Sequence, residues 1–196
     1  MSIDDVRDAV TGDGARNKWI GVWIGILAVL LAVCGVGGGN AAKDANRANI
    51  DASNLWSFFQ AKNIRRTSYI IAAEELELTL VTQPGLSAEA SAAVKSKISA
   101  WRTTADRYRS EPDTQEGLNE LSARAKLLES ERDAALRKDP YFDFSQALIQ
   151  IAIVLASVAI IAGTNTLLYG SYAAGALGIL LMMNGFWLMV RLPFLG

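Results

Sequence analysis

The polar residues inside two long uncharged stretches, 19–39 and 144–190, are the first candidates for chemistry. Amides at Gln150 and Asn184 could line a pore through an oligomer, although hydrogen bonding between helices is the commoner role of such residues. Proton relays in membranes use carboxylates, Lys or His, and neither stretch contains one. The two stretches therefore argue against a proton-coupled pump. Away from their ends they hold Gln146, Gln150, Ser157 and Asn184.

The groups that usually carry catalysis or bind metals are scarce. The sequence has no His and one Cys, so zinc, haem and di-iron sites lack the imidazole and thiolate ligands on which they depend. Cys34 lies inside an apolar stretch, which indicates a small packing residue and not a nucleophile. No serine has a histidine base, and no glycine-rich phosphate-binding loop occurs. We expect no enzyme, no cofactor and no catalytic, cofactor-binding or metal-binding residue.

Two clusters of charge lie between the uncharged stretches. Carboxylates within 74–77 could bind a divalent cation, and cations within 62–66 could contact acidic lipid or an acidic partner. In both clusters a solvated or internally paired helix face is the simpler interpretation. The whole sequence balances 19 Lys and Arg against 20 Asp and Glu, with a pI near 5.5. Because nucleic-acid binding requires a basic footprint, we expect no nucleic acid as a partner.

The uncharged stretches are long enough to cross a membrane. A helix needs about 20 apolar residues to span a hydrocarbon core of about 30 Å, and the uncharged stretch 144–190 is more than twice that length. The turn residues at 163–166, Gly-Thr-Asn-Thr, predict that the chain folds back there. The predicted transmembrane helices are 19–40, 143–163 and 167–190, and a C-terminal tail follows at 191–196.

A short tail, 1–18, precedes the first span. It holds three basic residues, as the start of a cleaved signal peptide would, but the apolar run after it exceeds the roughly 7 to 15 residues of such a peptide. We expect the run to stay in the protein as a membrane span. Ile3, Val6 and Val10 share one helical face behind Ser2, which predicts either a short amphipathic helix capped by Ser2 or a frayed end.

The polar segment between the first two spans, 41–142, is rich in Ala, Glu, Arg and Leu and poor in Gly and Pro. Residues 41–82 contain neither, and the Pro-Gly pair at 84–85 predicts the end of a long helix. Because the chain must return to the membrane, two shorter helices, predicted at 87–110 and 114–138, run back along the first. We therefore expect an all-α membrane protein, with three transmembrane helices and a long helical-hairpin, coiled-coil-like stalk outside the membrane between the first and second spans.

Local signals predict how the two returning helices begin and end. Pro112 predicts a kink between them, Asp113 and Glu116 have the spacing of a capping box, and Pro140 predicts the end of the second helix. Apolar residues at steps of three and four form a heptad seam. A two-helix hairpin has little core of its own, so we expect the seam to pack against copies of itself or a partner. The seam residues are Val94, Ile98, Trp101, Ala105, Tyr108, Leu118, Leu121, Ala125, Leu128 and Ala135.

Small residues recur at steps of three and four in all three spans. Helices associate in lipid through close backbone approach, which small residues permit, although Gly is common in any membrane helix. We expect all three spans to have closely packed neighbours. The glycines at 37–39 predict a flexible break or, equally, a loose helix end. The predicted packing residues are Gly21, Gly25, Ala28, Ala32, Gly35 and Gly39 in the first span, Ala152, Ala156, Ala159 and Gly163 in the second, and Gly170, Ala174 and Gly178 in the third.

Several segments match the pattern of a known family. They are Ala45–Asn49 and Asn54–Arg65 after the first span, and Tyr141–Phe144 and Gln146–Gln150 at the entry to the second. In these segments the chain resembles the bacterial membrane proteins catalogued as domain of unknown function 4337, over most of its length. The resemblance implies this topology and a multi-pass protein of the bacterial inner membrane, and it supplies no activity, substrate or catalytic residue. The tail lacks the histidines of many members, which argues against a metal site there.

Basic residues near the ends of the spans indicate the orientation in the membrane. Six lie on the side of the polar segment and the C-terminus and three on the other side, which favours a cytoplasmic stalk, although the first span alone favours the opposite. We expect a non-enzymatic, homo-oligomeric scaffold or accessory subunit of a larger membrane-protein complex, held in the lipid bilayer. The alternative is an oligomeric channel or mechanosensitive-type pore, lined by Gln150 or Asn184.

Overall fold

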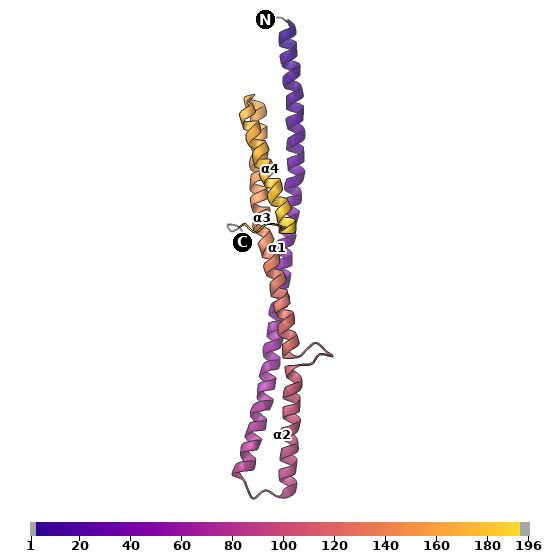
Figure 1. Ribbon diagram of the computed structural model, residues 1–196, viewed down its shortest axis with the longest axis vertical. Helices are drawn as coiled ribbons and strands as arrows, with labels where there is room; N and C mark the ends of the chain where they lie inside the picture. Colours follow the sequence, from indigo (N-terminus) through magenta and orange to yellow (C-terminus); the bar gives the residue numbers. More distant parts are fainter. Residues whose placement is uncertain (1–2, 193–196) are drawn as a thin grey trace. The chain divides into compact units, whose positions relative to one another are not determined.

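The computed structural model describes the backbone of residues 3–192 and the side chains of residues 14–192. Over this part the chain is all-α, with four helices and no strand; Figure 1 shows how they are arranged. Three of them, α1, α3 and α4, are long and apolar enough to cross a membrane, which indicates a membrane protein. The predicted Ser2 cap and the side chains of Ile3, Val6 and Val10 lie outside the described residues. The helices are α1 (Ile3–Thr82), α2 (Ala88–Arg109), α3 (Leu118–Ala162) and α4 (Asn165–Trp187).

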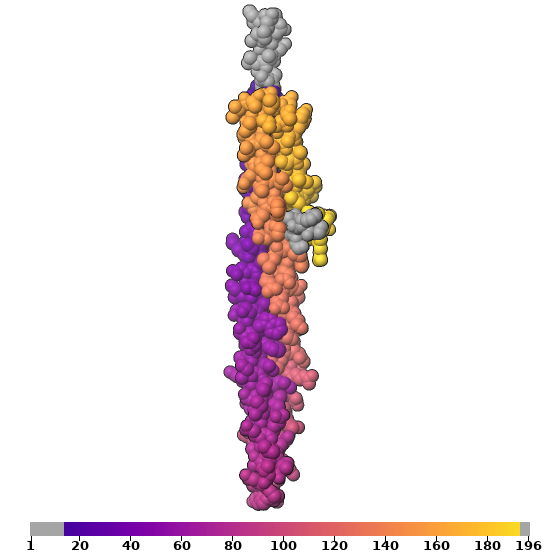
Figure 2. All heavy atoms as spheres, turned by 90° about the vertical axis from the view of Figure 1, so that its left-hand side faces the viewer, coloured from indigo at the N-terminus to yellow at the C-terminus, as the bar shows by residue number. Residues whose placement is uncertain are grey.

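The chain forms two compact units, to which α1 and α3 each contribute. We call residues 1–45 and 133–196 the apolar unit and residues 46–132 the polar unit. In the apolar unit α3 and α4 lie side by side, as the ribbon and the space-filling view both show (Figures 1 and 2). The polar unit contains the second half of α1, all of α2 and the start of α3.

Helix α1 is continuous where the sequence predicts a flexible break or a loose end. Gly37 and Gly38 are both helical and buried. A Cβ atom on Gly37 would lie 2.5 Å from Cε1 of Phe142, so the glycine is required for the close approach of this ring. The prediction at 37–39 is wrong in both forms, because packing against α3 holds this stretch in the helix. The helix ends at Thr82, as the Pro-Gly pair after it predicts.

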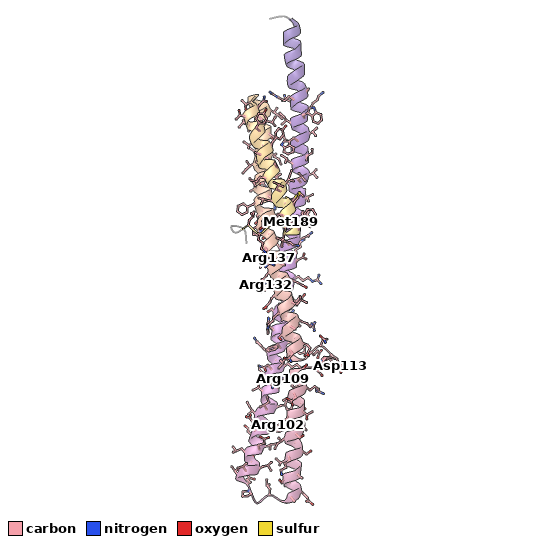
Figure 3. The ribbon with its side chains drawn as sticks, in the orientation of Figure 1. Arg102, Arg109, Asp113, Arg132, Arg137 and Met189 are labelled. Atoms are coloured by element: carbon pink, nitrogen blue, oxygen red, sulfur yellow. The ribbon has the colours of Figure 1, made fainter. Side chains whose placement is uncertain are left out.

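Helices α2 and α3 are separated by a loop over 110–117, so the predicted kink and the helix start at 114 are wrong. Asp113 and Glu116 do not form a capping box. The carboxylate of Glu120 closes the loop instead, since it accepts the Ser110 hydroxyl at 2.7 Å and the Glu111 N–H at 3.2 Å. Burial explains why α3 begins at Leu118 and not at 114. Leu118 and Leu121 are buried, whereas 112–116 are exposed and would gain no packing from a helical turn. Figure 3 labels Asp113 on this loop.

Helix α3 runs through Pro140, so the predicted helix end at this residue is wrong. A proline inside a helix removes one hydrogen bond and costs about 3 kcal/mol. The next two side chains offset that cost, because Tyr141 and Phe142 are almost fully buried and a buried aromatic side chain stabilises by about 1.5–3 kcal/mol. The ring of Phe142 also packs edge-to-face on Phe186, with centroids 4.9 Å apart.

The turn between α3 and α4 is confirmed at the predicted place. Helix α3 ends at Ala162, and Gly163 has a φ of +64°, a left-handed conformation that favours glycine after a helix. Helix α4 ends with Leu188 in the same conformation, at φ 49°, and the Leu188 N–H donates to the carbonyl of Asn184 at 2.7 Å.

Candidate functional site

The three apolar helices enclose a continuous core. Leu27 and Cys34 on α1, Ile149 on α3 and Met182 on α4 are buried together around Phe142. A second cluster joins Ile20 to Ala156, Ala159 and Leu168. The apolar unit is therefore closed on the inner face of each helix, and any assembly site in it must lie on the outer faces.

Two serine hydroxyls each tie all three apolar helices together. Ser145 on α3 donates to the carbonyl of Gly178 on α4 at 2.7 Å. Its oxygen lies 3.1 Å from Sγ of Cys34 on α1, and because the serine proton is committed to Gly178, the thiol is the donor of this second bond. Cys34 thus acts as a packing and hydrogen-bonding residue inside the core.

The second serine, Ser171, links the three helices in the same way, but it lies on α4 and donates to a carbonyl of α3. Ser171 on α4 donates to the carbonyl of Ala152 on α3 at 2.7 Å and accepts the indole N–H of Trp23 on α1 at 3.0 Å. Neither serine was predicted from the sequence. Their signal was the spacing, since Ser145 precedes the buried series Ile149, Ala152, Ala156 and Ala159, and Ser171 precedes Gly175, Gly178, Met182 and Gly185, at steps of four and three.

The predicted small residues of α3 and α4 fall mostly inside the core. Ala152, Ala156 and Ala159 are fully buried. A Cβ on Gly178 would lie 2.8 Å from Ile149, and one on Gly175, a position that the sequence analysis missed, would lie 2.8 Å from Trp23. Gly170 and Ala174, the other predicted residues of α4, are half-buried. Gly163 is exposed at the turn between α3 and α4.

The predicted small residues of α1 lie on the opposite side of that helix from the core. All of them are exposed, and a Cβ added at Gly21, Gly25 or Gly39 would meet nothing within 4 Å. At Gly35 it would meet only Oε1 of Gln146, at 4.0 Å. A row of exposed β-branched residues runs beside them, each one position later in the sequence: Val22, Ile26, Val29, Val33 and Val36. We call Gly21, Gly25, Ala28, Ala32 and Gly35 the outer face of α1.

The two amides considered for a pore have different surroundings. Asn184 is half-buried and is used within the chain, because its amide nitrogen donates to the carbonyl of Val190 at 2.7 Å and its oxygen accepts the Val190 N–H at 2.8 Å. Gln150 is exposed on α3, and within the described residues its amide makes no hydrogen bond. Ser157 donates to the carbonyl of Ile153 in its own helix. Of the two amides considered for a pore, Gln150 is therefore the one left for a partner.

In the polar unit, contacts between α1 and the two following helices run in opposite order along the chain. From the end of α1 backwards, Glu77 pairs with Arg102 at 2.8 Å and Tyr69 packs on Tyr108. Continuing, Lys62 pairs with Glu111 at 3.0 Å, the Trp56 N–H donates to Glu129 at 2.9 Å, and Asn49 accepts from Arg132. The second half of α1 thus packs antiparallel to α2 and then to the start of α3.

This packing buries or half-buries the seam residues within the single chain. Ile98, Ala105, Leu118, Leu121 and Ala125 are buried within the single chain. The remaining ones are half-buried or buried: Val94, Trp101, Tyr108, Leu128 and Ala135. Most of the seam is therefore covered within the single chain by the second half of α1, along which the returning helices were predicted to run. Packing of its half-buried residues on another copy or a partner stays a prediction.

Lys62 holds the loop between α2 and α3. Its ammonium is buried, pairs with Glu111, donates to the carbonyl of Glu116 and lies 5.5 Å from the ring centre of Tyr108. The hydrogen bond from Lys62 holds the pKa of Glu111 below its ordinary value. The hydroxyl of Ser110 likewise lowers the pKa of Glu120. Of the acidic cluster, Glu74 and Glu75 are exposed and Glu77 is paired; among residues 14–192 no group of acidic or thiol side chains could hold a metal ion.

Comparison with known proteins places the whole architecture in a family. No curated protein and no solved structure matches the chain. The model of a family described as a domain of unknown function, DUF4337, matches residues 16–188, which include all three apolar helices and the polar unit. The chain therefore belongs to the DUF4337 family.

Proposed function

We propose that this protein is a non-enzymatic membrane scaffold that assembles as a homo-oligomer through the outer face of α1. The observation that carries the proposal is the exposure of this face: the core uses the opposite side of the helix, and the space beside Gly21 and Gly25 is unfilled within the chain. Glycine inside a helix costs about 1 kcal/mol relative to alanine. A face that met only lipid would gain nothing in return for it.

The arrangement of the outer face suits contact between two helices in lipid. Small residues permit close backbone approach, which drives association where no hydrophobic force acts between helices. The neighbouring row of valines and Ile26 adds stiff side chains, which lose little rotamer freedom when a partner packs on them. Gly21 and Gly25 have the G-x-x-x-G spacing that places two glycines on one side of a helix.

Gln150 supports assembly independently. Its amide is exposed on α3 within the apolar stretch, where an unsatisfied polar group costs several kcal/mol in hydrocarbon. A hydrogen bond to another copy would remove this cost. The same residue favours the second candidate function, an oligomeric channel, because copies of Gln150 around an axis would line a polar path.

The surroundings of the scaffold follow from the same features. The location is the bacterial inner membrane, with the polar unit as a hairpin stalk on the cytoplasmic side, where the excess of basic residues near the span ends would put it. Because α1 covers most of the seam, the stalk does not need a second copy to bury it, and its outer surface is available to a partner protein. In a larger membrane complex, this chain would then be the accessory subunit.

The test is the native mass of the particle released from its own membranes by a mild detergent. We expect an integer multiple of 21.1 kDa, and we expect the double substitution Gly21→Ile, Gly25→Ile to reduce it to a single chain. Ala176→Ile makes a matched change at an exposed small residue of α4 and should leave the mass unchanged. A monomeric wild type, or equal loss in both variants, would contradict the proposal.

Channel and scaffold are separated by Gln150→Leu in the same preparation reconstituted into lipid. If the assembly conducts ions and this substitution abolishes the current while the mass stays the same, the channel is the function. If the wild type carries no current, the scaffold proposal stands alone.

A further inference from the structure

A basic cavity of about 670 Å³ lies between the three helices of the polar unit. Each helix supplies one cation to its wall: Arg66 from α1, Arg109 from the last turn of α2 and Lys126 from α3. Figure 3 labels Arg109. No Asp or Glu is among the described residues that line the cavity, so its walls carry positive charge without an internal counter-charge.

These cations differ from other basic residues of the same unit. Lys62 and Arg107 both contact Glu111, and Arg102 pairs with Glu77. By contrast, none of the three cavity cations forms an ion pair or a hydrogen bond within the described part of the chain. The Nε atom of Arg66 is also buried from solvent without an acceptor. Because a buried donor without a partner is unfavourable, the guanidinium of Arg66 has hydrogen-bonding capacity that the described residues leave unused.

The other walls of the cavity suit the same kind of ligand. Leu118 and Asn119, which line it, are the first two residues of α3, where backbone N–H groups lack intrahelical partners and the helix dipole favours negative charge. The rings of Trp56 and Phe59 form an aromatic wall, with centroids 5.4 Å apart. The Trp56 N–H is already taken by Glu129, so the wall offers its ring surface.

We propose that this cavity binds a phosphate-bearing ligand. The phosphate oxygens lie among Arg66, Arg109 and Lys126; the two guanidinium groups match phosphate geometry, and the Lys126 ammonium adds a third positive charge. The volume exceeds that of a phosphate group alone, so the rest of the ligand, an apolar or planar group, lies against Trp56 and Phe59. Two sources share this chemistry, a soluble organic phosphate and the headgroup of an anionic lipid. The site goes beyond the proposed scaffold function and does not depend on the outer face of α1.

The test is calorimetric titration of the full chain in nanodiscs. One arm uses neutral phosphatidylcholine nanodiscs and adds pyrophosphate or ADP. The other compares thermal unfolding of the chain in phosphatidylcholine nanodiscs with and without phosphatidic acid. We expect saturable binding in the first arm if the ligand is soluble, or stabilisation in the second if it is a lipid. Arg66→Gln should weaken either effect about tenfold or more, because it removes a charge-assisted bond.

The matched control is Arg65→Gln, which removes the same charge from an exposed neighbour that does not line the cavity. It should change the affinity less than threefold. Circular dichroism of each variant verifies that the helices remain formed. The proposal is overturned if the wild type responds in neither arm, or if Arg65→Gln and Arg66→Gln weaken the response equally.

Discussion

The two faces of α1 in the apolar unit carry the same kind of residue and have different surroundings. On the inner face, a methyl group on Gly37 would collide with Phe142, and one on Gly38 would lie in tight contact with it, at 3.2 Å. On the outer face, Gly21 and Gly25 have nothing beside them. A small residue therefore marks a place where something comes close, and the structure separates the neighbours that the chain itself supplies from those that must come from outside.

The polar unit repeats this contrast with charge. Lys62 is buried and fully paired, while Arg66, one turn further along α1, lines a cavity without a counter-charge. Each unit thus has one side where the chain supplies the packing or pairing partners, and one side where these partners are missing within the chain. Substitutions on the completed sides should cost stability, and those on the open sides should change only association or binding.

The largest loss is expected from Lys62→Met. The substitution removes the cation that pairs with Glu111 and holds the carbonyl of Glu116, and it leaves both groups without their donor. Breaking a pair of this kind is strongly destabilising, so we expect the midpoint of thermal unfolding to fall by about 10 °C. Circular dichroism at 222 nm measures it. Lys95→Met, at an exposed lysine of α2, should leave the midpoint nearly unchanged.

The same pair predicts how stability depends on pH. Glu111 and Glu120 have pKa values lowered in the folded protein from an ordinary 4.5. A lowered carboxyl pKa contributes stability that is present above the unfolded value and is lost as pH falls through the folded one. We expect the unfolding midpoint to be constant from pH 7 to about 5 and to fall below about 4.5. In Lys62→Met this acid-side fall should be smaller; an equal fall would show that Glu111 is not responsible.

Next in size is Gly37→Ala, on the inner face of α1. Alanine is the better helix former by about 1 kcal/mol, but its methyl group would lie 2.5 Å from the ring of Phe142. That ring is almost fully buried, so it cannot move aside without disturbing the core, and overpacking of this kind costs about 1–3 kcal/mol. We expect a net loss of about 1–2 kcal/mol in the free energy of unfolding, measured by denaturant titration in detergent.

A smaller loss is expected from Ser145→Ala. The change removes the donor to the Gly178 carbonyl and the acceptor of the Cys34 thiol, while keeping the small volume. Hydrogen bonds between membrane helices contribute about 0.6–2 kcal/mol, so we expect a loss of about 1 kcal/mol in the same denaturant titration. Ser157→Ala removes only a bond within α3 and serves as the control. If both variants lose equally, the bridge between the helices contributes nothing.

Some parts of the fold could be predicted from local signals alone. The end of α1 at Thr82 follows from the proline and glycine after it, and the turn at Gly163 follows from its run of turn residues. Both signals act within a few residues of the feature they produce. The three apolar helices likewise follow from the length of uncharged sequence.

The errors arose where packing from another helix outweighed a local preference. Pro140 does not end α3, because Tyr141 and Phe142 are buried directly after it. The glycines at 37–39 do not break α1, because Phe142 fills the space beside two of them. In both cases the deciding contact joins residues far apart in the sequence, and spacing along one segment carries no information about it.

The candidate site was predicted only in part, for a related reason. A period of three and four residues shows that small residues share a face, but it does not say what covers that face. On α3 the face of Ala152 is turned to the core; on α1 the face of Gly25 is turned outward. The bridging serines were missed because a hydroxyl inside a span becomes significant only when the carbonyl opposite it is known.

The smallest effect on stability is expected from Gly25→Ala, the same substitution on the other face of the same helix. An added methyl group would meet nothing within 4 Å, so only the helix preference for alanine remains, and the single chain should gain about 0.5–1 kcal/mol. Denaturant titration of dilute protein measures this gain, and native mass at higher concentration measures assembly. A more stable chain that assembles less well would show that Gly25 is kept for a neighbour outside the chain. If the chain becomes less stable when dilute, the outer face is already covered within the chain, and the contrast between the two faces fails.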